Sequence, residues 1–592
     1  MGEALPPGRL QVGCEALTDT ALVARVVPDV TGIDRTFDYL VPSALVPAAR
    51  PGSVVRMELN GRRVDGWIVA TGPHGSPGFD EVPVDRLSAL LDVAALGVAA
   101  EAVELCSWVA RRWSGPLRNV LRSATPERKR SRPVRARHGT AAAFDDEAAS
   151  AFRALPASGG VLEVPPLVSA LSVVHAAAAA GTVLVVCPTM RMARLGAASL
   201  RRRGLTTAEL PGQVDAALAG VDVVIGARSA VLAGCAGLTS IVVIDEHEES
   251  FHEERVPTWW APEVALERGR AAGVPVVLVS PCPSARAVML HGEPVRVAAG
   301  SGWPAIEIVD LGDVPVGSSL LSGPLLEAVR ESARSTLCVL NTKGAARMLV
   351  CASCRALQTC PSCSAAESLD GDFLVCPSCA HSRVSACSDC GRTKMATVRT
   401  GTSRLRDELA ANSRLPVREV TASTPDTGGE AQVYVGTEAL LHRVSSAGSV
   451  VFLDVDRDLS APRMTSGREV LASVARAARI VGQSGRIIIQ TRQPGHPLLV
   501  ALASGTTDEW RRSDTGTARS LGLAPFVSVA VIALPEGTVA PAITGHAAVQ
   551  WTATEGGILA RSADHDALLA FVSDVRSSAE GRVRVAVNPP RV

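Results

Sequence analysis

The residues whose type and spacing point most directly to chemistry are eight cysteines between Cys351 and Cys390. They form four CxxC pairs, CASC, CPSC, CPSC and CSDC, separated by five, twelve and seven residues. One CxxC pair presents two thiolates from a tight turn at the spacing of two corners of a zinc tetrahedron. Eight thiolates therefore predict two closed four-cysteine Zn²⁺ sites, which hold shape and leave no open position for a substrate.

A disulfide cluster is the alternative for these cysteines, and it requires an oxidising compartment. The N-terminus, MGEALPPGRL, lacks the basic and apolar regions of a signal peptide. The uncharged run 164–190 begins near two prolines and breaks at Gly181, which favours a buried helix and strand over a membrane span. We therefore expect a reducing, cytoplasmic location and no membrane partner. The remaining cysteines are expected in cores: Cys14, Cys106, Cys187, Cys235, Cys282 and Cys338.

Charge gives no global attraction to nucleic acid, because 59 basic and 59 acidic residues cancel. Binding to DNA must therefore come from local patches. The strongest one follows a predicted helix and carries seven cations from Arg122 to Arg137. It is either a solvated linker or an arm that contacts phosphates. Only 3% of residues are aromatic, so we expect salt-sensitive backbone contacts with little sequence preference.

Apolar patterning predicts several α/β domains in the 592 residues. Residues 21–72 alternate apolar and polar positions around Asn60-Gly61, which indicates a small antiparallel sheet with a hairpin. Residues 89–113 have a helical period. Two series of short apolar strands then alternate with helices, which predicts two parallel sheets covered on both faces: 183–188, 222–232, 238–250 and 274–281, then 336–341, 431–440, 449–456 and 485–491.

One strand ends in an acidic cluster, IVVIDEHEES, in which Asp245 would hold Mg²⁺ and Glu246 would orient water in a nucleotide-driven motor. Such a motor also needs a P-loop lysine followed by Ser or Thr. The three lysines, Lys129, Lys343 and Lys394, are followed by Arg, Gly and Met. Where the phosphate cradle would lie, residues 164–166 read Val-Pro-Pro, and proline lacks the N–H that binds phosphate. We therefore do not expect ATP hydrolysis by the usual route.

These landmarks, in this order, resemble the replication-restart primosomal protein PriA (primosomal protein N′) family, superfamily-2 DNA helicases. The resemblance rests on TFDYLVP, VLVVCPT, VVIGARSAV, VVIDEHEES, CVLNTKGAARMLVC, VYVGTEALL, VFLDVDRDL, IIIQT and the cysteines. It implies a multidomain α/β fold with two RecA-like parallel-sheet lobes, a small β-rich N-terminal DNA-binding domain, a two-zinc insertion and a small α/β C-terminal domain. The implied bounds are 20–88 for the 3′-end DNA-binding domain, 89–140 for a helical and basic linker, 150–295 for lobe 1, 300–347 and 396–496 for lobe 2, 348–395 for the zinc insertion and 497–592 for the C-terminal domain.

Departures from the family pattern gather at the nucleotide motifs. They are Asp245-Glu246-His247-Glu248 in place of DEEH, Ser280-Pro281-Cys282 in place of a SAT-like motif, His442-Arg443 in place of Lys-Gly, and Ala472, Ala475 and Ala478 in the arginine-finger motif. The resemblance then implies a vestigial nucleotide site at Asp245, Glu246, Arg476 and Arg479. It leaves ATP and Mg²⁺ doubtful as cofactors, and no catalytic residue is assigned.

The resemblance also implies metal and DNA contacts. Its nested zinc pairing joins Cys351 and Cys354 with Cys387 and Cys390, and Cys360 and Cys363 with Cys376 and Cys379. Spacing alone leaves sequential pairing open. The implied DNA-binding residues are Phe37, Asp38 and Tyr39, in a pocket where the aspartate meets the 3′ hydroxyl, and Arg62. Phe-x-Tyr on a strand is equally typical of core packing.

The favoured prediction is a DNA-binding replication-restart protein that recognises stalled or abandoned forks and nucleates primosome assembly without helicase activity. Its implied partners are forked and single-stranded DNA, other primosome proteins and single-stranded DNA-binding protein. One alternative is an active ATP-dependent 3′-5′ DNA helicase with an atypical site, for instance with Arg191 or Arg228 on the phosphates. Another is a protein-interaction scaffold with incidental DNA binding.

Overall fold

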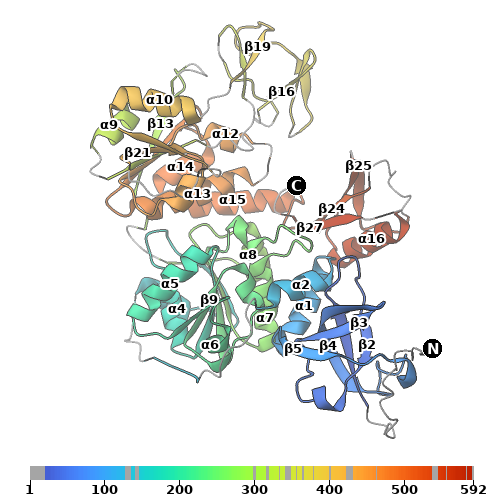
Figure 1. Ribbon diagram of the computed structural model, residues 1–592. Helices are drawn as coiled ribbons and strands as arrows, with labels where there is room; N and C mark the ends of the chain where they lie inside the picture. Colours follow the sequence, from blue (N-terminus) through green and yellow to red (C-terminus); the bar gives the residue numbers. More distant parts are fainter. Residues whose placement is uncertain are drawn as a thin grey trace, which may run out of the picture.

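The chain folds into two α/β lobes with three smaller parts attached, as Figure 1 shows for the computed structural model. The structure describes residues 21–589 apart from 127–134, 140–145, 298–301, 315–318, 332–333, 341–347, 355, 363–365, 378, 399–401, 422–423, 425–430, 462, 464, 536–543, 555, 580 and 582. Its multidomain α/β architecture confirms the predicted fold class. None of the helices among those residues has the length and apolar character needed to cross a membrane.

The N-terminal part is a five-stranded antiparallel sheet of order β2-β1-β4-β3-β5. Asn60 and Gly61 have φ of 50° and 74° and join β3 to β4, which confirms the predicted hairpin. Residues 89–113 were expected to be helical throughout, but 92–96 form β5, because this segment pairs with the edge of β3. The strands are β1 (Leu22–Pro28), β2 (Phe37–Leu40), β3 (Ser53–Leu59), β4 (Arg62–Pro73) and β5 (Asp92–Leu96).

Two helices, α1 (Ala100–Arg112) and α2 (Leu117–Ala124), connect this sheet to the first lobe. Trp113 at the end of α1 is fully buried in a core that also includes residues of the first lobe and the C-terminal sheet. Trp67 of β4 donates from Nε1 to Thr125 Oγ1 at 2.8 Å, which ties the sheet to the end of α2. The first part of the predicted basic linker is therefore helical and packed.

The first lobe is a seven-stranded parallel sheet of order β12-β6-β11-β10-β7-β9-β8, with helices on both faces. Its central strands are continuous apolar runs that are buried along their length, as expected for a covered parallel sheet. The strands are β6 (Gly159–Glu163), β7 (Thr182–Val186), β8 (Thr207–Glu209), β9 (Val223–Gly226), β10 (Leu238–Ile244), β11 (Val276–Ser280) and β12 (Val295–Arg296). The helices are α3 (Glu147–Arg153), α4 (Leu171–Ala178), α5 (Met190–Arg202), α6 (Val214–Ala219), α7 (Ala261–Ala272) and α8 (Ala285–His291).

The second lobe is a six-stranded parallel sheet of order β13-β23-β22-β14-β21-β20. Leu498, Leu499 and Leu502 of α14 lie in its core, so this lobe's packing extends beyond residue 496. The strands are β13 (Ala305–Asp310), β14 (Thr336–Val339), β20 (Val417–Val420), β21 (Val433–Gly436), β22 (Ser449–Phe452) and β23 (Arg486–Thr491). The helices are α9 (Gly323–Glu331), α10 (Thr402–Ser413), α11 (Ala439–Arg443), α12 (Asp456–Leu459), α13 (Ser466–Val481), α14 (Pro497–Ser504) and α15 (Thr507–Ser520).

The cysteine region grows out of the second lobe on a two-stranded antiparallel ladder, in which Met348 of β15 pairs with Val398 of β19. It projects away from the lobe in Figure 1. Beyond the ladder lies a three-stranded antiparallel sheet of order β16-β17-β18. The strands are β15 (Met348–Cys351), β16 (Ser368–Asp370), β17 (Phe373–Val375), β18 (Ser382–Val384) and β19 (Met395–Val398).

The C-terminal part is a four-stranded antiparallel sheet of order β25-β26-β24-β27 with one long helix. It packs beside α1 and the first lobe: Thr258 Oγ1 donates to Val587 O at 3.1 Å, and Arg576 Nη1 donates to Ser114 Oγ at 2.9 Å. The elements are β24 (Ser528–Ala533), β25 (Gln550–Thr554), β26 (Gly557–Ser562), α16 (His565–Ser578) and β27 (Arg584–Val587).

Candidate functional site

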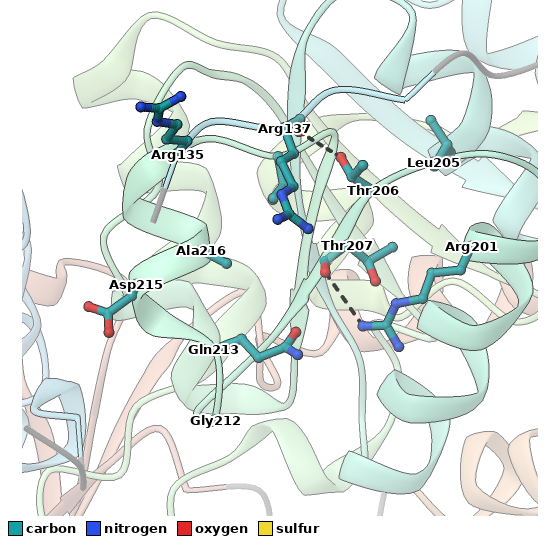
Figure 2. A pocket seen from close by; sticks show the side chains of 11 residues that line it. Arg135, Arg137, Arg201, Leu205, Thr206, Thr207, Gly212, Gln213, Asp215 and Ala216 are labelled. Atoms are coloured by element: carbon teal, nitrogen blue, oxygen red, sulfur yellow. Dashed lines mark hydrogen bonds between the residues drawn. The ribbon is translucent and has the colours of Figure 1, made fainter. Parts of the chain in front are cut away.

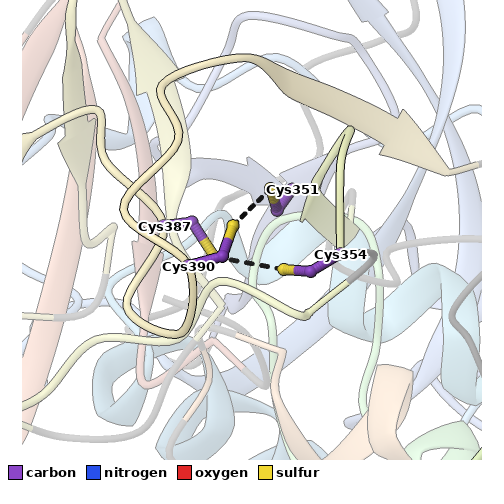
Figure 3. A group of neighbouring side chains, drawn as sticks. All are labelled: Cys351, Cys354, Cys387 and Cys390. Carbon is purple, nitrogen blue, oxygen red and sulfur yellow. Dashed lines mark hydrogen bonds between the residues drawn. The ribbon is translucent and has the colours of Figure 1, made fainter.

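Four cysteines from the two ends of the cysteine region converge on one point (Figure 3). Their Sγ atoms all lie within 4.8 Å of one another: Cys351, Cys354, Cys387 and Cys390. Adjacent sulfurs are 3.5 Å apart for Cys351 and Cys390, and for Cys354 and Cys387. Four sulfur donors at this separation fit a tetrahedral metal ion with bonds of about 2.3 Å.

A second group brings together Cys360, Cys376 and Cys379, again within 4.8 Å. The Sγ atoms of Cys360 and Cys379 are 3.5 Å apart. The fourth predicted ligand, Cys363, lies outside the described residues. Outer CxxC pairs thus meet each other, and the described inner cysteines meet each other. This is the nested grouping, which spacing alone left open, and each group could hold a metal ion.

Backbone N–H groups point at the first sulfur of the described CxxC turns. Ser353 N donates to Cys351 Sγ, Ser362 N to Cys360 Sγ and Asp389 N to Cys387 Sγ, each at 3.4 Å. Hydrogen bonds from the backbone N–H of Cys354 and Ser353 lower the pKa of Cys351 to about 6. Donors aimed at sulfur stabilise the thiolate, which is the form that binds metal.

The remaining sulfurs oppose ionisation of the whole cluster. The Ala356 N–H lowers the pKa of Cys354, but its hydrogen bonds to neighbouring sulfurs, Cys390 first, outweigh this and raise that pKa to about 12. Four thiolates within 4.8 Å repel one another unless a cation lies between them. A bound divalent metal would supply that cation and keep the ligands deprotonated. The donor set therefore fits a metal ion.

A buried polar network lies against the first cysteine group, and the sequence reasoning missed it. Gln358, fully buried, donates from Nε2 to Cys387 Sγ at 3.5 Å. Arg383 donates to Gln358 Oε1 at 3.3 Å and forms a 2.6 Å ion pair with Glu367, whose side chain is fully buried. Groups that orient metal ligands in this way tune metal affinity. Nothing in the sequence pattern distinguished Glu367 and Arg383 from other charged residues between the cysteines.

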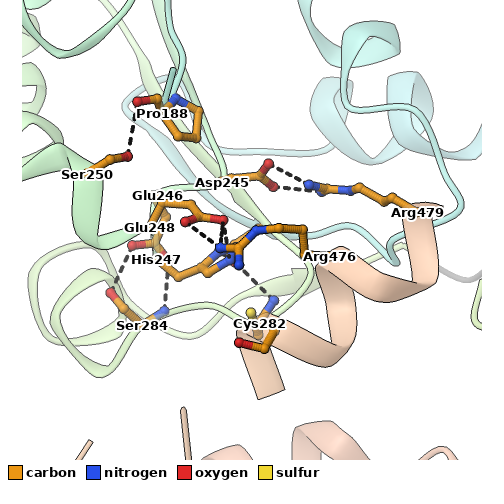
Figure 4. Close-up of polar contacts among 12 residues, drawn as sticks. Pro188, Asp245, Glu246, His247, Glu248, Ser250, Cys282, Ser284, Arg476 and Arg479 are labelled. Carbon is orange, nitrogen blue, oxygen red and sulfur yellow. Dashed lines mark hydrogen bonds and ion pairs between the residues drawn. The ribbon is translucent and has the colours of Figure 1, made fainter. Parts of the chain in front are cut away.

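Between the two lobes, two arginines of α13 pair with carboxylates of the acidic cluster (Figure 4). Asp245 directly follows β10 and forms a bidentate ion pair with Arg479 of α13, at 2.5 and 2.6 Å. One turn earlier on α13, Arg476 donates to both Glu248 oxygens at 2.6 and 2.7 Å and to Glu438 at 2.7 Å. Both arginines therefore bridge the lobes through carboxylates.

The electrostatics of Asp245 follow from this pairing, since its side chain is 1% exposed. Burial alone would raise the pKa of Asp245, but the charge and hydrogen bonds of Arg479 outweigh burial and hold that pKa below its usual value. Bidentate guanidinium–carboxylate pairs are among the strongest charged hydrogen bonds. The carboxylate predicted to hold Mg²⁺ is thus already neutralised by a protein cation.

Glu246 has no cationic partner among its described contacts and points into the first lobe. It accepts hydrogen bonds from Ser284 N at 2.7 Å and Ser284 Oγ at 2.8 Å, at the start of α8. Burial raises the pKa of Glu246 to about 7, although the Ser284 hydrogen bonds oppose the rise. Neighbouring His247 hydrogen-bonds through Nδ1 to Ser280 Oγ at 2.8 Å. This carboxyl binds the start of α8 instead of an arginine of the second lobe.

In the loop after β6, where a phosphate cradle would lie, backbone N–H groups already form hydrogen bonds within the protein. The N–H groups of Val164 and Leu167 donate to backbone carbonyls at 2.9 and 3.2 Å. Pro165 and Pro166 between them have no N–H. A phosphate cradle depends on several free backbone N–H groups directed at one point. This loop therefore offers a poor anion site.

Both arginines of the atypical-helicase alternative are engaged elsewhere. Arg191 donates from Nη1 to the backbone oxygens of His442 and Arg443 at 2.9 and 3.3 Å, another link between the lobes. Arg228 forms a 2.9 Å ion pair with Glu253. Using either side chain to bind phosphate would require breaking these contacts.

The predicted strand-end pocket lies on β2, where its three residues have different surroundings. Tyr39 is 4% exposed and donates its hydroxyl to Glu58 O at 2.8 Å, so its ring belongs to the core and cannot stack on a base. Asp38 forms a bidentate pair with Arg25, 2.9 Å for each bond. Phe37 is half-buried, with the Arg35 guanidinium 4.7 Å from its ring centre. Arg62 is exposed at the β3–β4 hairpin.

The chain is similar in sequence to several known proteins. The family model of the PriA 3′DNA-binding domain (3′BD) matches residues 25–126, which span β1 to α2. The probable replication restart protein PriA of Mycobacterium tuberculosis is 27% identical over 592 aligned residues, with 86% of each chain covered. The chain is similar to PriA proteins, along most of its length in the mycobacterial comparison.

Other PriA relatives match a smaller share. Replication restart protein PriA of Haemophilus influenzae is 25% identical over 344 residues, 52% of this chain and 47% of the relative. That of Bacillus subtilis is 26% identical over 363 residues, 54% and 44% respectively. The chain thus spans about half the length of these two PriA relatives. Among solved structures, Saccharomyces cerevisiae Dbp5 bound to RNA and ADP BeF3 superposes with a TM-score of 0.33 at 10% identity, covering 72% of this chain and 98% of that one.

Proposed function

We propose that the protein is a DNA-binding replication-restart factor of the PriA family whose two lobes serve as a scaffold and not as an ATP-driven motor. The matches to the 3′DNA-binding domain and to restart proteins support the DNA-binding part. The observation that carries the scaffold part is the ion pairing between the lobes, Arg479 with Asp245 and Arg476 with Glu248.

These ion pairs occupy the groups that a motor would direct at a nucleotide. In nucleotide-driven lobes, the acidic cluster holds Mg²⁺ and arginines stabilise the charge of the transferred phosphoryl group. Here Asp245 and Glu248 each neutralise an arginine instead. A triphosphate would have to separate both ion pairs. It would then meet no lysine of the first lobe, and the Val164 and Leu167 amides after β6 already donate to backbone carbonyls. The free energy lost with those ion pairs would oppose nucleotide binding between the lobes.

The cysteine region in this proposal is structural. We infer one Zn²⁺ at Cys351, Cys354, Cys387 and Cys390, and a second at Cys360, Cys363, Cys376 and Cys379. A closed four-thiolate site leaves the metal no position for water, so the ions would stabilise the fold of the module.

The DNA contacts are assigned to the N-terminal sheet, through Asp38, the exposed part of Phe37, and Arg62. The proposed ligands are forked and single-stranded DNA, and other primosome proteins and single-stranded DNA-binding protein would be the protein partners. A cytoplasmic location stays a prediction. The bounds of the six predicted regions also remain a proposal, with the second lobe extended to include α14 and α15 because α14 packs in its core.

The test uses the purified full chain with forked, single-stranded and blunt duplex DNA, with and without ATP and Mg²⁺. We expect preference for forked DNA, the same affinity in both conditions, and no ATP-dependent strand displacement. Robust unwinding that is abolished by Asp245→Ala would refute the scaffold and favour the atypical helicase. Equal binding of forked and blunt DNA would favour the alternative of a protein scaffold with incidental DNA affinity.

A further inference from the structure

A cavity of about 510 Å³ lies on the first lobe, at the N-terminal end of the edge strand β8. Arginines and amide or hydroxyl groups line it, as Figure 2 shows. Arg201 comes from the last turn of α5, and Gln213 precedes α6. Arg135 and Arg137 come from the basic stretch that the sequence left open between linker and phosphate-contacting arm. We call this cavity the arginine pocket, defined by Arg135, Arg137 and Arg201.

The stretch carrying two of these arginines is docked on the lobe. Arg137 N donates to Gly220 O at 3.0 Å, and Thr206 Oγ1 donates to Arg137 O at 2.8 Å. Two residues on, Gly139 N donates to Asp222 Oδ2 at 2.8 Å. A Cβ at Gly139 would lie 2.0 Å from a backbone oxygen, so only glycine fits this approach. The described part of the stretch, 135–139, is therefore fixed in place, unlike a solvated linker.

The arginine pocket has an excess of unpaired positive charge. Within the described part of the chain, the guanidinium groups of Arg135 and Arg137 have no ion pair or hydrogen bond to protein. Arg201 is partly neutralised by a 2.6 Å ion pair with Glu209. Asp215 is the single carboxylate among the residues that line the cavity. In Figure 2 the Arg137 side chain points toward Thr207 and Gln213, so donors gather on one side of the space.

We propose that the arginine pocket binds phosphodiester groups of DNA, at a second contact separate from the N-terminal sheet. Guanidinium matches phosphate in a bidentate geometry and keeps its charge at all physiological pH. The chain as a whole has zero net charge, so such binding requires a local patch of this kind. Arg135 also follows the end of the 3′DNA-binding domain match by nine residues, which brings the DNA-binding domain and the pocket onto neighbouring parts of the chain.

This inference rests on the proposed DNA-binding function and adds a site to it. An acidic segment of another protein is the competing ligand. The arrangement favours phosphate because its charge comes from rigid planar forks beside a neutral donor, the exposed Gln213 amide, which can share the oxygens of one phosphate.

The test compares the full chain with the variant Arg135→Gln/Arg137→Gln. The matched control is Arg330→Gln/Arg584→Gln, which removes two exposed arginines from α9 and β27. Affinity for forked DNA is measured by fluorescence anisotropy between 50 and 200 mM salt. Each phosphate contact adds about 0.9 to the slope of log affinity against log salt, so the pocket variant should lose roughly 2 from that slope. Across this range the wild type should then lose about tenfold more affinity than the variant.

An unchanged slope in the pocket variant would overturn the proposal, as would an equal loss of slope in the control variant. Polyglutamate binding to the same proteins provides the second arm. If the pocket variant loses polyglutamate binding and keeps the wild-type DNA slope, the pocket takes acidic protein segments and the proposal is wrong. A wild type that binds no DNA at all would instead refute the proposed function itself.

Discussion

The side chains of Arg479 and Asp245 join the two lobes, and the Asp245 carboxylate, 1% exposed, depends on this guanidinium for its neutralisation. A buried carboxylate that loses its partner keeps the cost of desolvation without compensation. This pairing could not be predicted from the sequence, because the two residues are 234 positions apart. An aspartate at the end of a buried strand is also an equally good ligand for Mg²⁺.

Substituting Arg479→Ala should lower the free energy of unfolding by about 2–4 kcal/mol, because Asp245 is left buried and unpaired. Chemical denaturation monitored by circular dichroism measures the change. Arg404→Ala is the control, since its pair with Glu408 is solvent-exposed on α10 and should contribute no more than about 0.5 kcal/mol. An Arg479→Ala protein as stable as the control would contradict the role given to this ion pair.

Glu246 gives a pH dependence of the opposite kind from a salt-bridged acid. Its pKa is raised from 4.5 to about 7 in the folded protein by burial, so the folded state binds the proton more tightly than the unfolded state. Its contribution to stability is full below pH 4.5 and is lost as pH rises to 7. Between pH 5 and 8 the wild type should therefore lose roughly 2–3 kcal/mol relative to Glu246→Gln, which does not ionise.

The measurement is denaturant unfolding of both proteins at several pH values. Burial lowers the pKa of His247, which contributes a pH dependence of the opposite sign. This contribution is common to the wild type and Glu246→Gln, so it cancels when the two stabilities are subtracted. A stability difference that stays constant from pH 5 to pH 8 would show that Glu246 does not titrate in this range.

At the level of elements, the cysteine module was the most predictable part, because its signal is a local spacing that no packing partner can change. Residues 92–96 show the opposite case: a helix-like apolar period became strand β5, since the edge of β3 was available to pair with it. Likewise, Tyr39 fitted a DNA pocket in sequence, and only the position of Glu58 O reveals its core role. Pairing across elements is the information that one sequence lacks.

Removing one thiolate tests the module as a unit. Cys376→Ser should reduce bound zinc from two ions to one per chain, and the β16–β18 sheet should unfold locally because metal binding and folding are coupled. Plasma mass spectrometry gives the zinc content, and limited proteolysis locates the unfolding. Cys106→Ala removes a buried cysteine of α1 and should keep both ions. Retention of two zinc ions by Cys376→Ser would contradict the assignment of that ligand.

At the scale of the whole molecule, the two parallel sheets followed from apolar runs, whereas the way the lobes face each other did not. Apolar strands are buried in any α/β lobe and carry no information on the partner lobe. The contacts that fix the lobes come from α13, Arg191 and the acidic cluster, all of which the sequence motifs had assigned to nucleotide chemistry. The sequence shows that the P-loop lysine is absent. It does not show that Arg479 and Arg476 pair with the acidic residues.

The ladder of β15 and β19 has a further consequence. Because Met348 and Val398 are partners across it, the polypeptide departs from the second lobe and rejoins it at adjacent points. Topologically the metal module is a side branch, so substitutions within it leave the parent sheet's connectivity unaltered, and the reverse holds too. Such independence is compatible with eight cysteines in CxxC spacing on a chain whose lobes are joined by arginine–carboxylate pairs.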